Sequence, residues 1–138
     1  MNSLDIKSYA FPSIVEKREQ GVLRVFESDN LPFTIKRVFS VVNAKSGSKR
    51  GQHAHKKCNQ IICCVAGVIK LICDDGKTQV ELNLTPETEA VLVPCGIWAE
   101  QDYLKDNSVI IVFCDQFYDE NDYIRGYDEF IKWKKSQK

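Results

Sequence analysis

Two histidines, His53 and His55, are the residues of this chain whose type and spacing most directly suggest chemistry. The chain has no other histidine, and residues two apart on a strand share a face, so both imidazoles would point the same way. An imidazole can take up and release a proton near neutral pH, which makes a convergent pair a candidate acid/base device. The same spacing also occurs by chance on exposed strands, and the pair taken alone favours that simpler interpretation.

The elements that would position this pair are predicted to be strands. Thirteen Val and twelve Ile residues stand against eight Leu and six Ala, and β-branched side chains favour strands over helices. Strands without intervening helices predict an all-β sandwich or barrel. The expected strands are 22–27, 34–42, 51–55, 60–65, 68–74, 78–84, 90–93, 97–103 and 108–114.

The connections and the C-terminus carry clear local signals. Asp74-Asp75-Gly76-Lys77 predicts a hairpin with a type I′ turn, because Asp-Gly tolerates positive φ values. Apolar residues at helical spacing predict one helix at about 120–135, with Asp119 to Asp122 as its acidic N-terminal residues. The stripe consists of Tyr123, Ile124, Tyr127, Phe130 and Ile131. No internal repeat and no Gly/Ser/Pro-rich linker interrupts the chain, so residues 1–138 are expected to form one domain.

Composition and charge exclude several function classes. Nineteen Lys and Arg balance nineteen Asp and Glu, so no overall positive field attracts nucleic acid or an anionic membrane. The longest apolar stretch, residues 61–69, is far shorter than a membrane span, and residues 1–9 lack the apolar region of a signal peptide. Six cysteines without a C-x-x-C pattern, two of them the adjacent Cys63 and Cys64 on opposite faces of a strand, favour reduced, buried thiols. A cytoplasmic protein is expected.

The surroundings of the histidine pair resemble the cupin superfamily. Gly47, His53, His55, Gln60 and Gly67 match the first cupin motif, G-x5-H-x-H-x4-E-x6-G, except that Gln60 replaces the glutamate. The run from 94 to 99, Pro-Cys-Gly-Ile-Trp-Ala, resembles the second motif, P-x-G-x2-H, with alanine in place of the histidine. This resemblance implies a jelly-roll antiparallel β-barrel with the short helix at its end. Because two of the four usual ligands are absent, no metal and no cofactor are expected.

A longer resemblance covers most of the chain. Residues 30–38, 50–57, 74–76, 98–100 and 118–125 are similar to the WxcM-like or FdtA-type sugar 3,4-ketoisomerases. The family implies a metal-independent isomerase that moves the carbonyl of dTDP-4-keto-6-deoxy-D-glucose from C4 to C3. It also implies a homodimer, often with an exchanged N-terminal segment, and a downstream PLP-dependent aminotransferase that makes 3-amino sugars for surface glycans such as the O-antigen of lipopolysaccharide. Relatives often carry Tyr where this chain has Phe39 or Ser40, and often His at Ala99.

Site roles follow from this chemistry. His53 and His55 would be the acid/base groups, and which of them is the primary base stays open. Cations would bind the diphosphate or stabilise an oxyanion, and the Gln60 amide would either bind a sugar hydroxyl or form a structural hydrogen bond. Trp98 would either stack on thymine or pack in a core or dimer interface, and Glu100, on the same face, would bind substrate or form an outward salt bridge. The substrate-binding candidates are Arg37, Arg50, Lys56, Gln60, Trp98 and Glu100.

Two alternative functions remain open on the sequence. The Arg50-Gly51-x-His53 string is similar to the R-G-x-H of dTDP-sugar 3,5-epimerases, in which the arginine contacts the substrate and the histidine is the base. A non-catalytic cupin that binds a sugar is the other alternative. Hydrogen exchange separates the three, because a 3,4-isomerase exchanges C3 and C4, an epimerase C3 and C5, and a binding protein neither.

Overall fold

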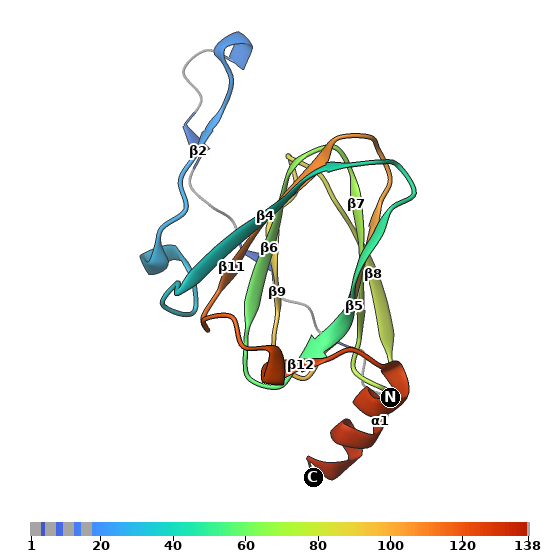
Figure 1. Ribbon diagram of the computed structural model, residues 1–138. Coiled ribbons are helices and arrows are strands. Elements are labelled where there is room, and N and C mark those ends of the chain that lie inside the picture. Colours follow the sequence, from blue (N-terminus) through green and yellow to red (C-terminus); the bar gives the residue numbers. More distant parts are fainter. Residues whose placement is uncertain (1–3, 5–7, 10–12, 15–17, 138) are drawn as a thin grey trace.

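The computed structural model describes residues 4, 8–9, 13–14 and 18–137, and its body consists of two five-stranded antiparallel sheets that face each other (Figure 1). The first sheet has the order β1 (Ser8–Tyr9), β9 (Ala90–Val93), β6 (Gln60–Ala66), β11 (Ser108–Cys114), β4 (Arg37–Ala44). The second has the order β12 (Tyr123–Ile124), β5 (Lys49–His55), β10 (Trp98–Tyr103), β7 (Ile69–Asp74), β8 (Gln79–Leu84). The all-β expectation is confirmed, although among the described residues no strand pairing joins the two sheets into a closed barrel.

Short elements complete the structure. β2 (Ser13–Ile14) and β3 (Leu23–Arg24) form a separate hairpin, which extends away from the two sheets (Figure 1). The helical segments are η1 (Arg18–Gln20), η2 (Ser28–Asn30), η3 (Glu120–Asp122) and α1 (Tyr127–Ser136). No helix in the described part of the chain is long and apolar enough to cross a membrane. The predicted exchange of an N-terminal segment falls largely on residues outside the described ones.

The period of two along each strand builds the core between the sheets. On β6, Ile62 and Cys64 point into this core, whereas Ile61 and Cys63 point to the outer face of the first sheet. The predicted opposite orientation of the adjacent cysteines is therefore confirmed. All six cysteines are free, and five of them are buried.

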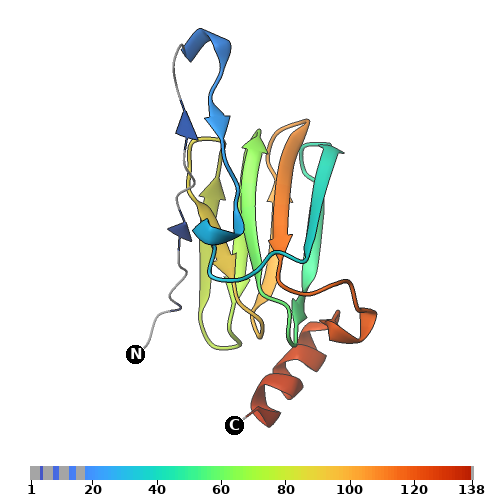
Figure 2. The same cartoon turned by 90° about the vertical axis from the view of Figure 1, so that its left-hand side faces the viewer.

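Both outer faces are covered by segments from elsewhere in the chain. The segment around residues 26–35 crosses the first sheet, where Phe26 and Phe33 pack with Phe113 (Figure 2). On the second sheet, α1 packs against one end of the outer face, where its buried Phe130 contacts Trp98. Apolar residues therefore lie on both faces of the first sheet and on the part of the second sheet near α1, so an apolar residue in a strand does not by itself indicate the inner face.

The C-terminal helix begins later than predicted. Tyr123 and Ile124 form β12, paired with His55 and Ala54 of β5, and α1 begins at Tyr127 after Gly126. Glycine is a poor helix former, and aromatic and β-branched residues suit a strand, so the chain changes from strand to helix at this glycine. The acidic residues of the first turn are Asp128 and Glu129, not the predicted 119–122.

Two other local predictions need correction. The strand predicted at 22–27 is reduced to Leu23–Arg24, and the one predicted at 34–42 begins at Arg37. The hairpin between β7 and β8 is present, but of its loop residues only Gly76 has a positive φ (96°), whereas a type I′ turn needs two. The Asp75 carboxylate shapes the loop instead, because it accepts hydrogen bonds from the amides of Lys77 (2.8 Å) and Thr78 (2.7 Å).

Candidate active site

The two histidines lie together, as the sequence predicts, with perpendicular rings whose centroids are 5.0 Å apart. His53 lines a cavity of about 260 Å³, whereas His55 is not among the residues that line it. The cavity is formed by side chains from β4, β5, β6, β10 and the segment containing β12. Its lining consists of Phe39, Ser40, Val41, Arg50, Gly51, His53, Gln60, Gln101, Tyr123 and Arg125.

A bulge in β5 brings Arg50 and His53 to the same cavity. Residues three apart on a regular strand point to opposite faces, but here Gly51 and Gln52 both have positive φ values, 80° and 57°. The register with β10 shifts at this point, so that one extra residue is accommodated in β5. A Cβ at Gly51 would lie 2.9 Å from the carbonyl oxygen of Ala99, so the close approach requires glycine.

His53 is held as a neutral base. Its Nδ1 lies 3.0 Å from the carbonyl oxygen of Gly51, and since a carbonyl can only accept, Nδ1 carries the proton. Burial and then the neighbouring His55 lower the pKa of His53 to about 4. At neutral pH the lone pair of Nε2 is therefore free to accept a proton.

His55 is held by a carboxylate that the sequence analysis did not single out. Nδ1 of His55 donates to Oδ2 of Asp122 at 2.8 Å, and both side chains are less than a tenth exposed. Burial lowers the pKa of His55, although the carboxylate opposes this shift. Hydrogen bonds from His55 and from the amides of Lys57 and Cys58 lower the pKa of Asp122 despite its burial. The Nε2 of His55 is buried and has no hydrogen-bond partner in the described structure.

Tyr123 packs against both histidines. Its ring centroid lies 5.0 Å from that of His53 and 4.4 Å from that of His55. The guanidinium of Arg125 stacks over the ring at 4.4 Å and forms a two-point ion pair with Glu120, at 2.8 and 2.9 Å. Tyr123 and Arg125 are not predicted as cavity residues, because the apolar spacing places Tyr123 in a helix, whereas it lies in β12.

Two amides from opposite sheets also line the cavity. Gln60 points inward as predicted, and its Nε2 donates to the sulfur of Cys114 at 3.6 Å. Gln101 was missed, although its spacing from Ala99 could have identified it, because both lie on the inward face of β10. Its side-chain oxygen accepts a hydrogen bond from the buried Tyr103 hydroxyl at 2.8 Å, which leaves its NH₂ group to donate to a ligand.

Arg37 lies behind the cavity lining, in contact with two thiols. Its Nη2 is 3.6 Å from the sulfur of Cys114 and 4.0 Å from that of Cys58. The contact with Cys58 and the contact with Arg37 lower the pKa of Cys114 to about 7, although burial opposes the shift. Burial works to lower the pKa of Arg37, but its interactions with Cys114 and Tyr123 raise it.

One side-chain cluster has the composition of a metal site. Donor atoms of His55, Cys58 and Asp122 all lie within 4.8 Å of one another. The carboxylate already accepts from His55 and two amides, however, and the Arg37 cation contacts the Cys58 sulfur. A nearby positive charge opposes a divalent cation, so this cluster fits hydrogen-bonded support of His55 better than metal ligation.

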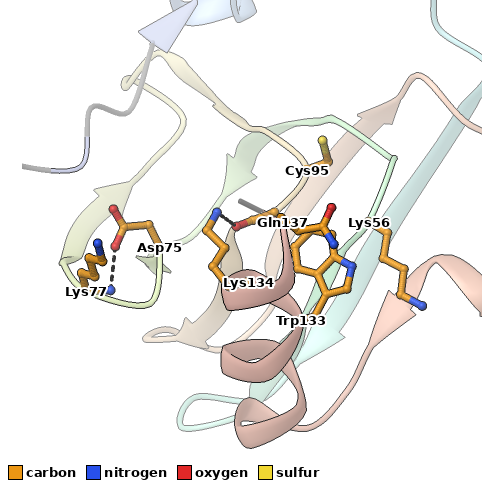
Figure 3. Close-up of a pocket in the computed structure, with 8 residues that line it drawn as sticks. Lys56, Asp75, Lys77, Cys95, Trp133, Lys134 and Gln137 are labelled. Carbon is orange, nitrogen blue, oxygen red and sulfur yellow. Dashed lines mark hydrogen bonds between the residues drawn. The ribbon is translucent and has the colours of Figure 1, made fainter.

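Three predicted substrate-binding residues lie away from the cavity. Trp98 and Glu100 share a face, as predicted, but it is the outer face of β10, where the indole Nε1 donates to Glu100 Oε2 at 2.8 Å beneath α1. Lys56 lines a different cavity, of about 550 Å³, between α1 and the loops that follow β7 and β9 (Figure 3). In that cavity Lys134 donates to the Gly96 carbonyl at 2.6 Å, so α1 is fixed to the β9–β10 loop. These three residues therefore do not line the cavity that contains His53.

Comparison with known proteins places this geometry in a family. The family model FdtA, described as WxcM-like, C-terminal, matches residues 4–135. The chain belongs to this family. A TDP-4-oxo-6-deoxy-alpha-D-glucose-3,4-oxoisomerase from Aneurinibacillus thermoaerophilus is 35% identical over 130 residues, which are 94% of this chain and 93% of that protein.

Solved structures agree with the family assignment. The 3,4-ketoisomerase QdtA from Thermoanaerobacterium thermosaccharolyticum, in a mutant form with TDP-4-keto-6-deoxyglucose, has a TM-score of 0.89 at 28% identity and covers 96% of this chain and 95% of its own. A dTDP-4-dehydrorhamnose 3,5-epimerase from Bacillus anthracis has a TM-score of 0.74 at 15% identity, covering 86% of this chain and 77% of its own. The epimerase comparison shows a shared fold alone.

Proposed function

We propose that this protein is a sugar 3,4-ketoisomerase that converts dTDP-4-keto-6-deoxy-D-glucose into the corresponding 3-keto sugar. Family membership, the 35% identical oxoisomerase and the QdtA likeness support this activity. The observation that carries the mechanism is His53, a neutral imidazole with a free Nε2 in a cavity lined by Arg50 and Arg125. Together these groups supply a base and the positive charge that an enediolate needs.

The base would act on the hydrogen at C3, next to the C4 carbonyl. Proton removal there gives an enediolate, and a guanidinium close to the developing oxyanion lowers the barrier. Arg50 and Arg125 both line the cavity and both keep a permanent charge, so either can stabilise O4 or bind the diphosphate. Gln60 and Gln101, from opposite sheets, would hold the sugar hydroxyls.

His53 is the stronger candidate for the primary base because it lines the cavity, whereas His55 does not. Replacing His53 with Asn keeps a polar side chain of similar size but removes the base, and kcat should fall by about 10² or more. His55 would orient Tyr123 and complete the contact with Asp122, so it is a positioning residue. A His53→Asn variant that keeps near-native turnover, with TDP still bound, would exclude this assignment.

The activity is tested by proton NMR of dTDP-4-keto-6-deoxyglucose incubated with the metal-stripped protein in D₂O. Appearance of a 3-keto product with deuterium at C4 is the expected result, and the H4 configuration identifies the galacto or gluco series. Exchange at C3 and C5 without a 3-keto product would indicate a 3,5-epimerase. A bound nucleotide sugar with an unchanged spectrum would indicate a binding protein.

The biological setting extends this proposal. The 3-keto product is the substrate form that a PLP-dependent aminotransferase needs to make a 3-amino sugar, and such sugars belong to surface glycans such as O-antigen. Because these reactions use nucleotide sugars, the proposal includes a cytoplasmic location. Coupled conversion with a dTDP-3-keto-sugar aminotransferase, pyridoxal phosphate and glutamate should yield an amino sugar only when this protein is present.

The protein is further proposed to act as a homodimer. Val38 and Val42 are each 54% exposed on β4, the edge strand of the first sheet, and Leu23 on the projecting β2–β3 hairpin is 59% exposed. Exposed apolar side chains along an unpaired edge are typical of an interface. Light scattering after size-exclusion chromatography should give twice the chain mass, and Val38→Lys should shift the protein towards the monomer.

A further inference from the structure

Movement of the carbonyl requires more than a base for carbon. The hydrogen leaves C3 and arrives at C4, but a proton must also leave the oxygen on C3 and reach the oxygen on C4. The two sugar oxygens are neighbours, so one protein group placed between them could serve both. The need for this second proton transfer rests on the proposed ketoisomerase activity. The residues that line the cavity are the candidates for the group that performs it.

Among the residues that line the cavity, His53 and Tyr123 have side chains that can both donate and accept a proton in an acid/base step. The two arginines keep their protons, and the two glutamines do not titrate. Ser40 lies on the edge strand β4 and is exposed, and Phe39 beside it has no exchangeable proton. With His53 assigned to carbon, Tyr123 remains for the oxygens.

The position of Tyr123 fits this task. Its ring packs against the rings of His53 and His55 and under the Arg125 guanidinium, and these three contacts fix the position of the ring. Interaction with Tyr123 also raises the pKa of Arg37, which is a second cation near this ring. The two cations would stabilise the negative charge that passes between the phenol oxygen and the sugar.

We infer that the Tyr123 hydroxyl carries the proton between O3 and O4 of the sugar while His53 carries the hydrogen between C3 and C4. In the first half, Nε2 of His53 takes the proton from C3, the C3–C4 double bond forms, and Tyr123 donates its proton to O4. In the second half, the Tyr123 oxygen takes the proton from O3, the C3 carbonyl forms, and C4 takes the proton from His53. C3 is oxidised as C4 is reduced, and both protein groups regain their starting forms.

Tyr123→Phe tests this role because it keeps the ring and its packing and removes only the hydroxyl. Product formation should fall by about 10² or more, the usual scale for an acid/base group. Exchange of the substrate C3 hydrogen with D₂O should fall much less, because His53 is intact. The ratio of exchange to conversion, read by proton NMR, should therefore rise at least tenfold, and TDP affinity measured by calorimetry should stay within twofold.

Tyr127→Phe is the matched control. The Tyr127 hydroxyl also donates a hydrogen bond, to Asp74 at 2.9 Å, but it lies on α1 away from the cavity lining. This variant should keep both conversion and exchange near the wild-type rates. If the wild-type protein gives no 3-keto sugar, the proposed function fails. If the wild type converts substrate and Tyr123→Phe either converts it as fast or loses exchange and conversion equally, the relay fails and the function stands.

Discussion

The carboxylate of Asp122 accepts a hydrogen bond from Nδ1 of His55 at 2.8 Å, across 67 positions of sequence. The same carboxylate accepts from the amides of Lys57 and Cys58, so one buried side chain holds the turn after β5 and the histidine before it. Asp122 is followed directly by Tyr123, whose strand pairs with β5 at His55. This contact therefore sets the position of the tyrosine relative to both imidazoles.

Loss of the Asp122 charge should weaken this junction. Asp122→Asn replaces a carboxylate that accepts three hydrogen bonds with an amide that has one acceptor oxygen, and the free energy of unfolding should fall by about 2 kcal/mol. Urea unfolding followed by circular dichroism measures this change. Asp119→Asn is the control, because Asp119 caps η3 at the surface and Asn caps equally well. Equal stability of the two variants would contradict the structural role of Asp122.

The activity should persist in mildly acidic solution. With a pKa of about 4, His53 stays neutral down to about pH 5, whereas an unperturbed histidine near 6.5 would already be protonated there. Protonation of His53 removes the base. The contribution of His53 to kcat/KM should therefore be constant from pH 7 to pH 5, and kcat/KM should fall tenfold for each pH unit below 4. Initial rates in buffers of constant ionic strength measure the profile. A midpoint near 6.5 would show that His53 is not desolvated as described.

The bulge at Gly51 should be necessary for the site. Gly51→Ala places a methyl group 2.9 Å from the Ala99 carbonyl oxygen, so β5 and β10 must separate beside His53. Gly47→Ala is a close control, since its φ of 89° is just as unfavourable for alanine but nothing lies within 4 Å of the added atom. In both variants the left-handed backbone conformation should lower the free energy of unfolding by about 1–2 kcal/mol.

The difference between these two glycine variants isolates the steric contact. Gly51→Ala should lower the melting temperature further than Gly47→Ala and should reduce kcat at least tenfold, a loss of about 1.4 kcal/mol in transition-state stabilisation. Differential scanning calorimetry and steady-state kinetics provide the two measurements. Equal melting temperatures and equal kcat values for the two variants would mean that the contact between Gly51 and the Ala99 carbonyl is not required for the site.

Neighbouring residues on β10 should have opposite effects. Glu100 bonds the Trp98 indole on the outer face, whereas Gln101 lines the cavity. Glu100→Ala should therefore leave kcat/KM within twofold, while Gln101→Ala should lower it by roughly tenfold, close to the value of one hydrogen bond. Both are measured by steady-state kinetics with the dTDP-sugar. A loss of kcat/KM larger than twofold for Glu100→Ala would support the original prediction that Glu100 binds substrate.

Several features of the site follow from the sequence because they depend on local periodicity. The alternation of β-branched runs predicts the strands, and the period of two places His53 and His55 on one face and Cys63 and Cys64 on opposite ones. Gln60 is also found inward as predicted. These relationships need only the conformation of a single strand.

The tertiary structure decided what lies on each side of a strand and which distant segments meet. Because α1 packs on the outer face of the second sheet at Trp98, this indole is buried on the side away from the cavity, although its apolar character alone would also fit the inner face. The bulge at Gly51 brings Arg50 and His53 to one cavity, although strand parity predicts the reverse. Tyr123 reaches the histidines through pairing of β12 with β5, a contact that no local propensity encodes because its two partners are 68 residues apart.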